Sequence, residues 1–90
     1  MPVVRIPAAL KYYVDNHSEL DIPASSVTEL LAALAEHYPT VKFHLLDSDG
    51  NLRRHFNIFV NGEHISELDG LDTALNSEDK VILLASAAGG

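Results

Sequence analysis

The fold of this chain is decided by one stretch of its sequence, Phe56-Asn57-Ile58-Phe59-Val60-Asn61-Gly62. Phe56, Ile58 and Val60 alternate with Asn57, Phe59 and Asn61, which is the pattern of a strand with one buried face. Asn-Gly is the dipeptide that a type I′ hairpin turn favours most. The stretch therefore predicts a strand over residues 56–60, a tight turn at 61–62 and a short returning strand over 63–65.

Further strands are predicted toward both ends of the chain. Residues 3–10 are apolar and β-branched, and we expect a strand there that Pro7 bends. A turn cluster at 15–18 and an alternating segment at 19–22 complete an amino-terminal hairpin. Residues 81–85 form a last apolar strand. The first and last strands are the most apolar, so we expect them side by side at the centre of the sheet.

The clearest helix signal is the capping box Ser26-Val27-Thr28-Glu29, in which the side chains of the first and fourth residues each accept an amide hydrogen of the other. An apolar stripe follows at helical spacing, formed by Val27, Leu30, Leu31, Leu34 and Tyr38. Pro39 ends this helix, and residues 41–46 fit either a short helical turn or a strand. The predicted fold is an α+β roll, in which one main helix covers one face of a mixed sheet of four to five strands.

The composition narrows the classes of function. The chain has 90 residues, 47% of them hydrophobic, as in a single globular domain. Its net charge of -7 would repel phosphate backbones, so nucleic acid is not a predicted partner. It has no cysteine, which excludes thiol catalysis and favours a reducing compartment. No apolar run is long enough to cross a membrane, and prolines at positions 2 and 7 interrupt any signal peptide, so we expect a cytoplasmic protein.

No catalytic or metal-binding constellation is present in the sequence. The five histidines lack the spacing that places two ligands on one turn of a predicted helix. The segment Asp47-Ser48-Asp49-Gly50-Asn51 has its glycine at the fourth position, whereas a calcium loop needs it at the sixth, so it is interpreted as a turn. The sequence therefore predicts no metal site and no enzyme.

The remaining feature is the end of the chain, Ser86-Ala87-Ala88-Gly89-Gly90. We divide the chain into a domain over residues 1–85 and a flexible tail over 86–90. Five extended residues reach about 17 Å, and their small side chains could pass through a narrow channel. The terminal carboxylate is ionised at neutral pH and is a poor electrophile. Adenylation by an ATP-dependent partner would activate it for attack by sulfide, a persulfide or a thiol.

The sequence resembles the MoaD/ThiS group of ubiquitin-like sulfur carriers over essentially its whole length. The matching features are the first strand at 3–7, the capped helix, the stretch Leu52-Arg53-Arg54-His55 with the strand and Asn-Gly turn after it, the turn Gly70-Leu71-Asp72-Thr73 and the Gly89-Gly90 terminus. The stretch from residue 52 to residue 62 is most similar to that of the CysO-type carriers of cysteine synthesis and secondary metabolism.

The resemblance implies a β-grasp fold and a protein that is a cosubstrate and not a catalyst. A ubiquitin-activating-type enzyme would use Mg-ATP to adenylate Gly90, and a thiocarboxylate formed there would donate sulfide to a sulfur-accepting synthase. This chain would bind no cofactor itself. A sulfurtransferase and a C-terminal processing protease are further expected partners, and the free protein is expected to be a monomer.

Two other functions remain open at this stage. The chain could be a protein modifier that is conjugated to lysine through Gly90, because conjugation passes through the same acyl adenylate. It could also be the small subunit of molybdopterin synthase, with its tail inserted into a larger subunit.

A docking surface for the partners is predicted from strand alternation. If the majority of apolar side chains face the helix, Phe59, Ile82 and Leu84 form an apolar patch on the other face of the sheet, unless flanking loops bury them. Residues 55–79 lack Lys and Arg and contain six acidic residues, Glu63, Glu67, Asp69, Asp72, Glu78 and Asp79. These could steer a basic partner or could form only a solvated acidic face.

Overall fold

The computed structural model of the protein describes residues 1–86, and residues 87–90 lie outside the described part. The strands are β1 (Val3–Arg5), β2 (Glu19–Asp21), β3 (Phe56–Val60), β4 (Glu63–His64) and β5 (Lys80–Ala85). The helices are α1 (Ala8–Lys11), α2 (Val27–His37) and α3 (Pro39–Leu45), with 3₁₀ turns η1 (Tyr12–Val14), η2 (Ile65–Glu67) and η3 (Gly70–Asp72). None of the helices within residues 1–86 has the length and apolar character of a membrane span.

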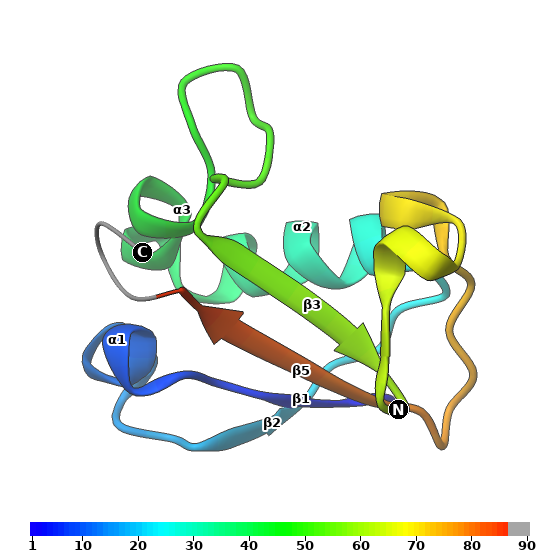
Figure 1. The fold of residues 1–90 in the computed structure, drawn as a ribbon. Coiled ribbons are helices and arrows are strands. Elements are labelled where there is room, and N and C mark those ends of the chain that lie inside the picture. The colour runs from blue at the N-terminus through cyan, green and yellow to red at the C-terminus, as the bar shows by residue number, and fades with distance from the viewer. Residues whose placement is uncertain (87–90) are drawn as a thin grey trace.

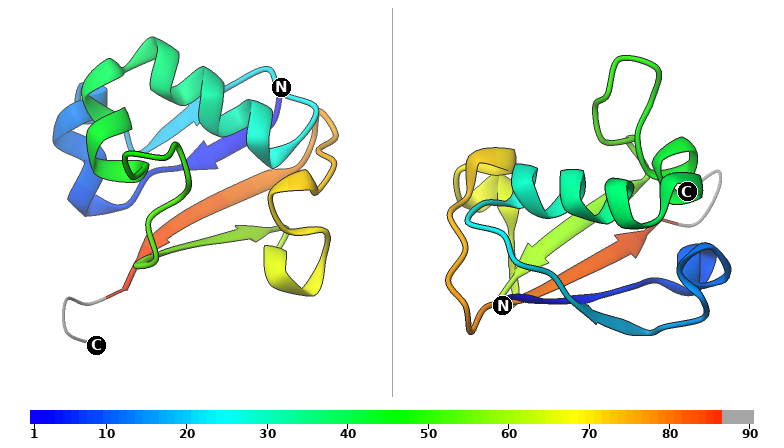
Figure 2. Two further views of the ribbon diagram at one scale, coloured as in Figure 1. Left: turned by 90° about the horizontal axis from the view of Figure 1, so that it is seen from above. Right: turned by 180° about the vertical axis from the view of Figure 1, so that it is seen from behind.

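The five strands form one mixed sheet in the order β2-β1-β5-β3-β4. β1 and β5 lie side by side and parallel, with Val4 opposite Val81, and the other pairs are antiparallel. The α2 helix crosses one face of this sheet, and α3 packs against α2 (Figures 1 and 2). This confirms the predicted α+β roll and the central position of the first and last strands.

A single hydrophobic core lies between the sheet and the helices. The α2 helix contributes Val27, Leu30, Leu31 and Leu34, which are the buried members of the predicted stripe. They pack in one cluster with the strand residues Val4, Phe56, Ile58, Val60, Val81 and Leu83. Every second residue of β3 and β5 is therefore buried beneath α2, and the residues between them face the other side of the sheet.

The turn and cap that the sequence predicts are present. Asn61 and Gly62 both have positive φ, 51° and 88°, as a type I′ turn requires. The Ser26 hydroxyl accepts the Glu29 amide hydrogen at 3.1 Å. The Glu29 carboxylate accepts the Ser25 amide at 3.0 Å, so it reaches one residue further back than the capping box predicts.

Three predicted strands end earlier than expected, and one of them, predicted over 19–22, ends at Asp21. The prediction of a strand over 3–10 is wrong after Arg5, because Pro7 precedes the short α1 helix, and the Leu10 amide donates to the Pro7 carbonyl at 2.9 Å. Leu10 and Val14, four residues apart, are both buried by this helical path. The returning strand ends at His64, because the His64 side chain accepts the Ser66 amide and caps the η2 turn that begins at Ile65.

The segment 41–46, which fitted either a helical turn or a strand, is largely helical. Pro39 occupies the first turn of α3, where a missing amide hydrogen costs nothing. Val41 and Leu45 are fully buried, whereas Phe43 between them is exposed; a strand would place all three on one face, so this pattern requires a helix.

Asp79 joins the turn after β3 to the start of β5. Its two carboxylate oxygens accept the Asn61 side-chain amide at 2.9 Å and the Asn76 backbone amide at 2.7 Å. The Asn61 oxygen in turn accepts the Lys80 amide at 3.0 Å. The hydrogen bond from the Asn76 backbone, followed by the one from Asn61, lowers the pKa of Asp79 below its usual 3.8.

Asp79→Asn is therefore expected to destabilise the protein in a pH-dependent way. The side-chain amide introduced at position 79 would have only one oxygen acceptor, so its NH₂ group would face either the Asn61 side-chain amide or the Asn76 backbone amide, which are both donors. The variant should therefore lose about 1 kcal/mol of unfolding free energy at pH 7. Because the folded carboxyl has the lower pKa, its stabilisation is present above pH 3.8 and is lost as the pH falls through the folded pKa. Urea denaturation at pH 7 and pH 3 should show the two proteins converging at pH 3. Glu78→Gln is the matched control, and a difference that is the same at both pH values would contradict this role of Asp79.

Candidate functional site

The face of the sheet opposite α2 is the candidate docking face. Phe59 and Ile82 are direct cross-strand partners on this face, and Leu84 follows two residues after Ile82. Phe59 and Ile82 are half-buried, whereas Leu84 is 47% exposed. The structure thus brings the three predicted patch residues together on the side that the helices leave uncovered. Their role in docking stays a prediction.

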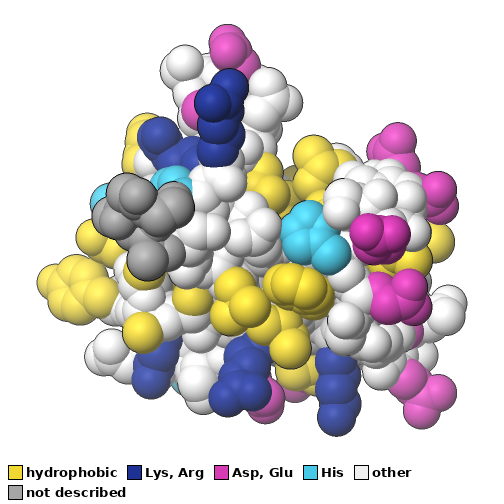
Figure 3. Space-filling view, viewed as in Figure 1, with side chains coloured by type: hydrophobic (Ala, Val, Ile, Leu, Met, Phe, Trp, Pro, Cys, Tyr) yellow, Lys and Arg dark blue, Asp and Glu magenta, His cyan; other side chains and the backbone are white. Residues whose placement is uncertain are grey.

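Charged side chains surround this apolar patch. Figure 3 shows hydrophobic side chains gathered across the middle of the face, with Lys and Arg along its lower edge and acidic side chains to one side. A shallow pocket beside Ile82 is lined by Val3, Arg5, Glu19 and Lys80. The uncovered face therefore combines an apolar centre with a charged rim, as protein interfaces commonly do.

The predicted acidic cluster lies at the end of the molecule that contains η2, η3 and the start of β5 (Figures 1 and 3). Five of its members are exposed, namely Glu63, Glu67, Asp69, Asp72 and Glu78. The sixth, Asp79, is committed to the two hydrogen bonds described above. Steering of a basic partner by this end stays a prediction.

The tail begins at the opposite end of the molecule, where β5 ends beside the start of β3. Ala85 is paired with Phe56, and the next residue, Ser86, donates its amide hydrogen to the His55 carbonyl at 2.6 Å. The Ser86 hydroxyl accepts the Asn57 side-chain amide at 3.0 Å. Ser86, which the sequence assigned to the tail, is thus attached to β3. The other predicted tail residues, Ala87, Ala88, Gly89 and Gly90, lie outside the described residues.

We call Ser86, from which the tail starts, the tail root. Two residues linked to it, Asn57 and His64, were not predicted from the sequence. Asn57 lies on the same face as Phe59 and Leu84, and His64 is the cross-strand partner of Phe59. The rings of Phe59 and His64 meet edge to face with centroids 5.1 Å apart. The alternation of β3 contained a signal for Asn57, because it predicts residues 57 and 59 on one face. His64 needed the register of the hairpin as well.

Basic side chains are concentrated around the segment that precedes β3. Three of the six Lys and Arg residues of the chain are Lys42, Arg53 and Arg54. Arg53 donates to the Phe43 carbonyl at 3.0 Å, and the Phe43 ring is 72% exposed beside it. Because Ser86 is bonded to His55, the tail leaves the sheet next to this basic segment, far from the acidic end.

The described residues contain no group of three or more His, Asp or Glu that could hold a metal ion. His44 stacks on Tyr13 and His55 packs against Phe56. Asp47 Oδ1 accepts the amides of residues 49 and 51, which confirms that the segment 47–51 is a turn.

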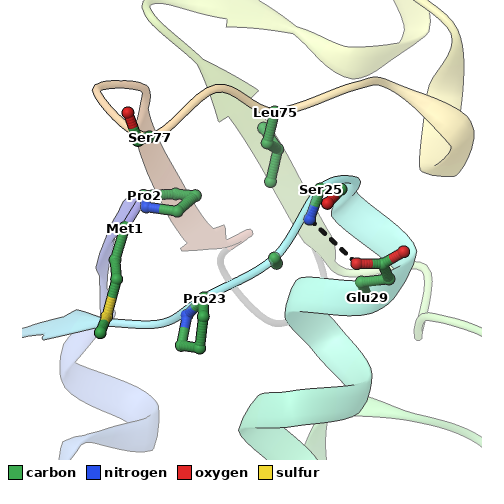
Figure 4. A pocket seen from close by; sticks show the side chains of 8 residues that line it. Met1, Pro2, Pro23, Ser25, Glu29, Leu75 and Ser77 are labelled. Atoms are coloured by element: carbon green, nitrogen blue, oxygen red, sulfur yellow. Dashed lines mark hydrogen bonds between the residues drawn. The ribbon is translucent and has the colours of Figure 1, made fainter.

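A separate pocket near the amino terminus offers no reactive group either. Figure 4 shows that Met1, Pro2, Pro23 and Leu75 supply much of its wall. The amide of Ser25 and the carboxylate of Glu29 on its edge bond each other in the helix cap. The Ser25 amide and the Glu29 carboxylate therefore have a structural role in the helix cap.

Comparisons with known proteins give a family match and several similar relatives. The ThiS family matches residues 4–90. A proposed sulfur carrier protein of Archaeoglobus fulgidus is 34% identical over 89 residues, covering 97% of this chain and 96% of the relative. The sulfur carrier protein CysO of Mycobacterium tuberculosis is 30% identical with the same coverage.

Solved structures show the same fold. CysO in the Amycolatopsis orientalis BexX/CysO complex superposes with a TM-score of 0.88 at 23% identity and covers both chains completely. Small archaeal modifier protein 1 of Methanosarcina acetivorans gives a TM-score of 0.89 at 27% identity, covering 99% of this chain and 95% of that one. The sheet and helices form the ubiquitin-like β-grasp fold that the sequence predicts.

Proposed function

Because this chain belongs to the ThiS family, we propose that it is a sulfur carrier whose terminal Gly90 is adenylated and then converted to a thiocarboxylate. The observation that carries the proposal is the extent of the family match, which runs through the sheet, the tail root and the Gly89-Gly90 terminus. Of two relatives that are similar over nearly their whole length, one is the sulfur carrier CysO and the other is a proposed sulfur carrier.

The proposed chemistry takes place at one carbonyl carbon. The Gly90 carboxylate attacks the α-phosphorus of ATP in an activating enzyme, which forms an acyl adenylate and releases pyrophosphate. Sulfide then attacks the carbonyl carbon, and AMP leaves with the displaced oxygen. A persulfide in the same role would give an acyl disulfide, which a thiol must cleave to release the thiocarboxylate and a disulfide. The resulting thiocarboxylate donates its sulfur to an acceptor synthase, and water restores the carboxylate. Mg-ATP belongs to the activating partner in this scheme, and the carrier binds no cofactor.

The face of the sheet opposite α2, which we call the open face, is the proposed contact surface for these partners. Phe59, Ile82 and Leu84 would be covered by the activating enzyme and by the acceptor in turn. Continuity supports this assignment, since Leu84 lies two residues before the tail root at Ser86. A partner seated on the face would then be placed to receive the carboxylate. A structure with the same fold comes from the Amycolatopsis orientalis BexX/CysO complex, which supports the assignment of a partner-binding role.

Mass spectrometry tests the proposed chemistry directly. Incubation with a ubiquitin-activating-type enzyme of the same genome, Mg-ATP and sulfide should exchange one oxygen for sulfur at Gly90. Fragment spectra must locate the change, because oxidation of Met1 adds nearly the same mass. A reaction without ATP is the control. An unmodified Gly90 in the complete reaction would contradict the proposal.

A second candidate function is protein modification through Gly90. Its support is the high structural similarity to small archaeal modifier protein 1 at 27% identity. Gly-Gly remnants on lysines of cellular proteins, together with no thiocarboxylate, would favour this function. Stable copurification with a larger subunit would favour the third function, the small subunit of a synthase.

A further inference from the structure

A chain of side-chain hydrogen bonds crosses the open face from β4 to the tail root. Ser66 contacts His64 Nδ1 through both its amide, at 3.1 Å, and its hydroxyl, at 2.9 Å. His64 Nε2 lies 3.1 Å from Asn57 Oδ1. Asn57 Nδ2 donates to the Ser86 hydroxyl at 3.0 Å. Three elements that are separate in the sequence are thereby linked at the point where the tail begins.

Each link in this chain fixes the orientation of the next. The Ser66 amide can only donate, so His64 Nδ1 must accept and the ring proton lies on Nε2. That proton points to Asn57 Oδ1, which leaves the Asn57 amide nitrogen facing Ser86. The Phe59 ring packs edge-on against His64 and limits its rotation.

The last link acts on the residue that directs the tail. Ser86 is held through its backbone at His55 and through its side chain at Asn57. Four residues, about 13 Å of extended chain, separate it from the reacting carboxylate. The direction of the chain at Ser86 therefore bears directly on where Gly90 can reach.

We propose that His64 and Asn57 are positioning residues, which fix the direction in which the tail leaves the sheet when a partner covers the open face. The inference rests on the proposed function. In the free protein these hydrogen bonds are exposed or only partly buried, so water competes for them and each contributes little to folding. A docked partner would exclude that water and strengthen the bonds. Loss of a link should accordingly be seen in the activation rate more than in stability.

The test measures binding and reaction separately. The variants are Asn57→Ala, Ser86→Ala and the double variant, and the rate is ATP-pyrophosphate exchange at saturating carrier. We expect each variant to react five- to tenfold more slowly, with a Kd for the activating enzyme within twofold of wild type. The double variant should be no slower than the single ones, because all three lack the same bond. Ser86→Thr keeps a hydroxyl and should restore the rate.

Thr28→Val is the matched control, since it removes a hydrogen bond to the Leu71 carbonyl at a distance from the tail. An equal loss in this control, additive losses in the double variant, or unchanged rates would overturn the positioning role. A wild-type carrier that is not adenylated would instead overturn the proposed function. Nitrogen NMR of the imidazole tests the geometry without any enzyme, because it should show His64 protonated at Nε2. Protonation at Nδ1 alone would contradict the chain of bonds.

Discussion

Leu83→Asp is expected to abolish folding, whereas Ile82→Asp is expected to leave the fold intact and abolish docking. Leu83 is fully buried beneath α2, and Ile82 lies one residue earlier on the opposite face of β5. An unpaired charge at position 83 would be placed in the core, at a cost of several kcal/mol against a typical stability of about 5–15 kcal/mol. The same charge at position 82 would meet solvent in the free protein and an apolar partner surface in the complex.

Circular dichroism, thermal melting and calorimetric titration with the activating enzyme separate these two effects. We expect Ile82→Asp to weaken binding at least 100-fold, because a central apolar contact in an interface is worth about 2 kcal/mol or more and the new charge would be desolvated there. Ile82→Val serves as the conservative control and should bind within a few-fold of wild type. If Ile82→Asp unfolds, Ile82 is a core residue. If it folds and binds normally, the docking surface lies elsewhere.

The parts of the fold that follow from local pattern could be predicted from the sequence. Alternation in residues 56–60 assigned both faces of β3, and Asn61-Gly62 fixed the hairpin turn. The path of residues 8–14 could not be predicted, because an apolar segment after Pro7 fits a strand as well as a short helix. The structure buries Leu10 and Val14 and leaves Tyr12 between them exposed, which a strand would not do, and that burial depends on the complete core.

The candidate site shows the same division. The apolar patch could be predicted because successive side chains of a strand point to opposite faces, and this alternation can be followed along β3 and β5 without knowing the rest of the fold. The link from His64 through Asn57 to Ser86 joins residues 7 and 29 positions apart. Such a link depends on the pairing of Asn57 with Leu84, so the register had to be known first. The sequence assigned His64 no role, whereas the structure gives it a specific position in this link.

Deletion of Gly90 is expected to lower the rate of adenylation by at least 100-fold and to leave docking unchanged. The reacting carboxylate would be withdrawn by one residue, about 3.5 Å, while the open face and the tail root at Ser86 stay as they are. Displacement of a reacting group by about 1 Å can already cost about 100-fold, because attack requires close alignment with the α-phosphorus. The variant should still bind the activating enzyme with the Kd of the wild-type protein and should compete with it.

Tail length and tail composition can be separated with two matched variants. Ala88→Gly keeps the length and should react at nearly the wild-type rate, because it removes only one methyl group from a tail of small residues. One glycine added after Gly90 moves the carboxylate forward and should be adenylated as poorly as the deletion in a purified system without protease. If the deletion variant reacts normally, the distance from Ser86 to the carboxylate does not control the reaction. The positioning role of Asn57 would then lose its physical basis, since a tail that tolerates a shift of a whole residue needs no fixed direction at its root.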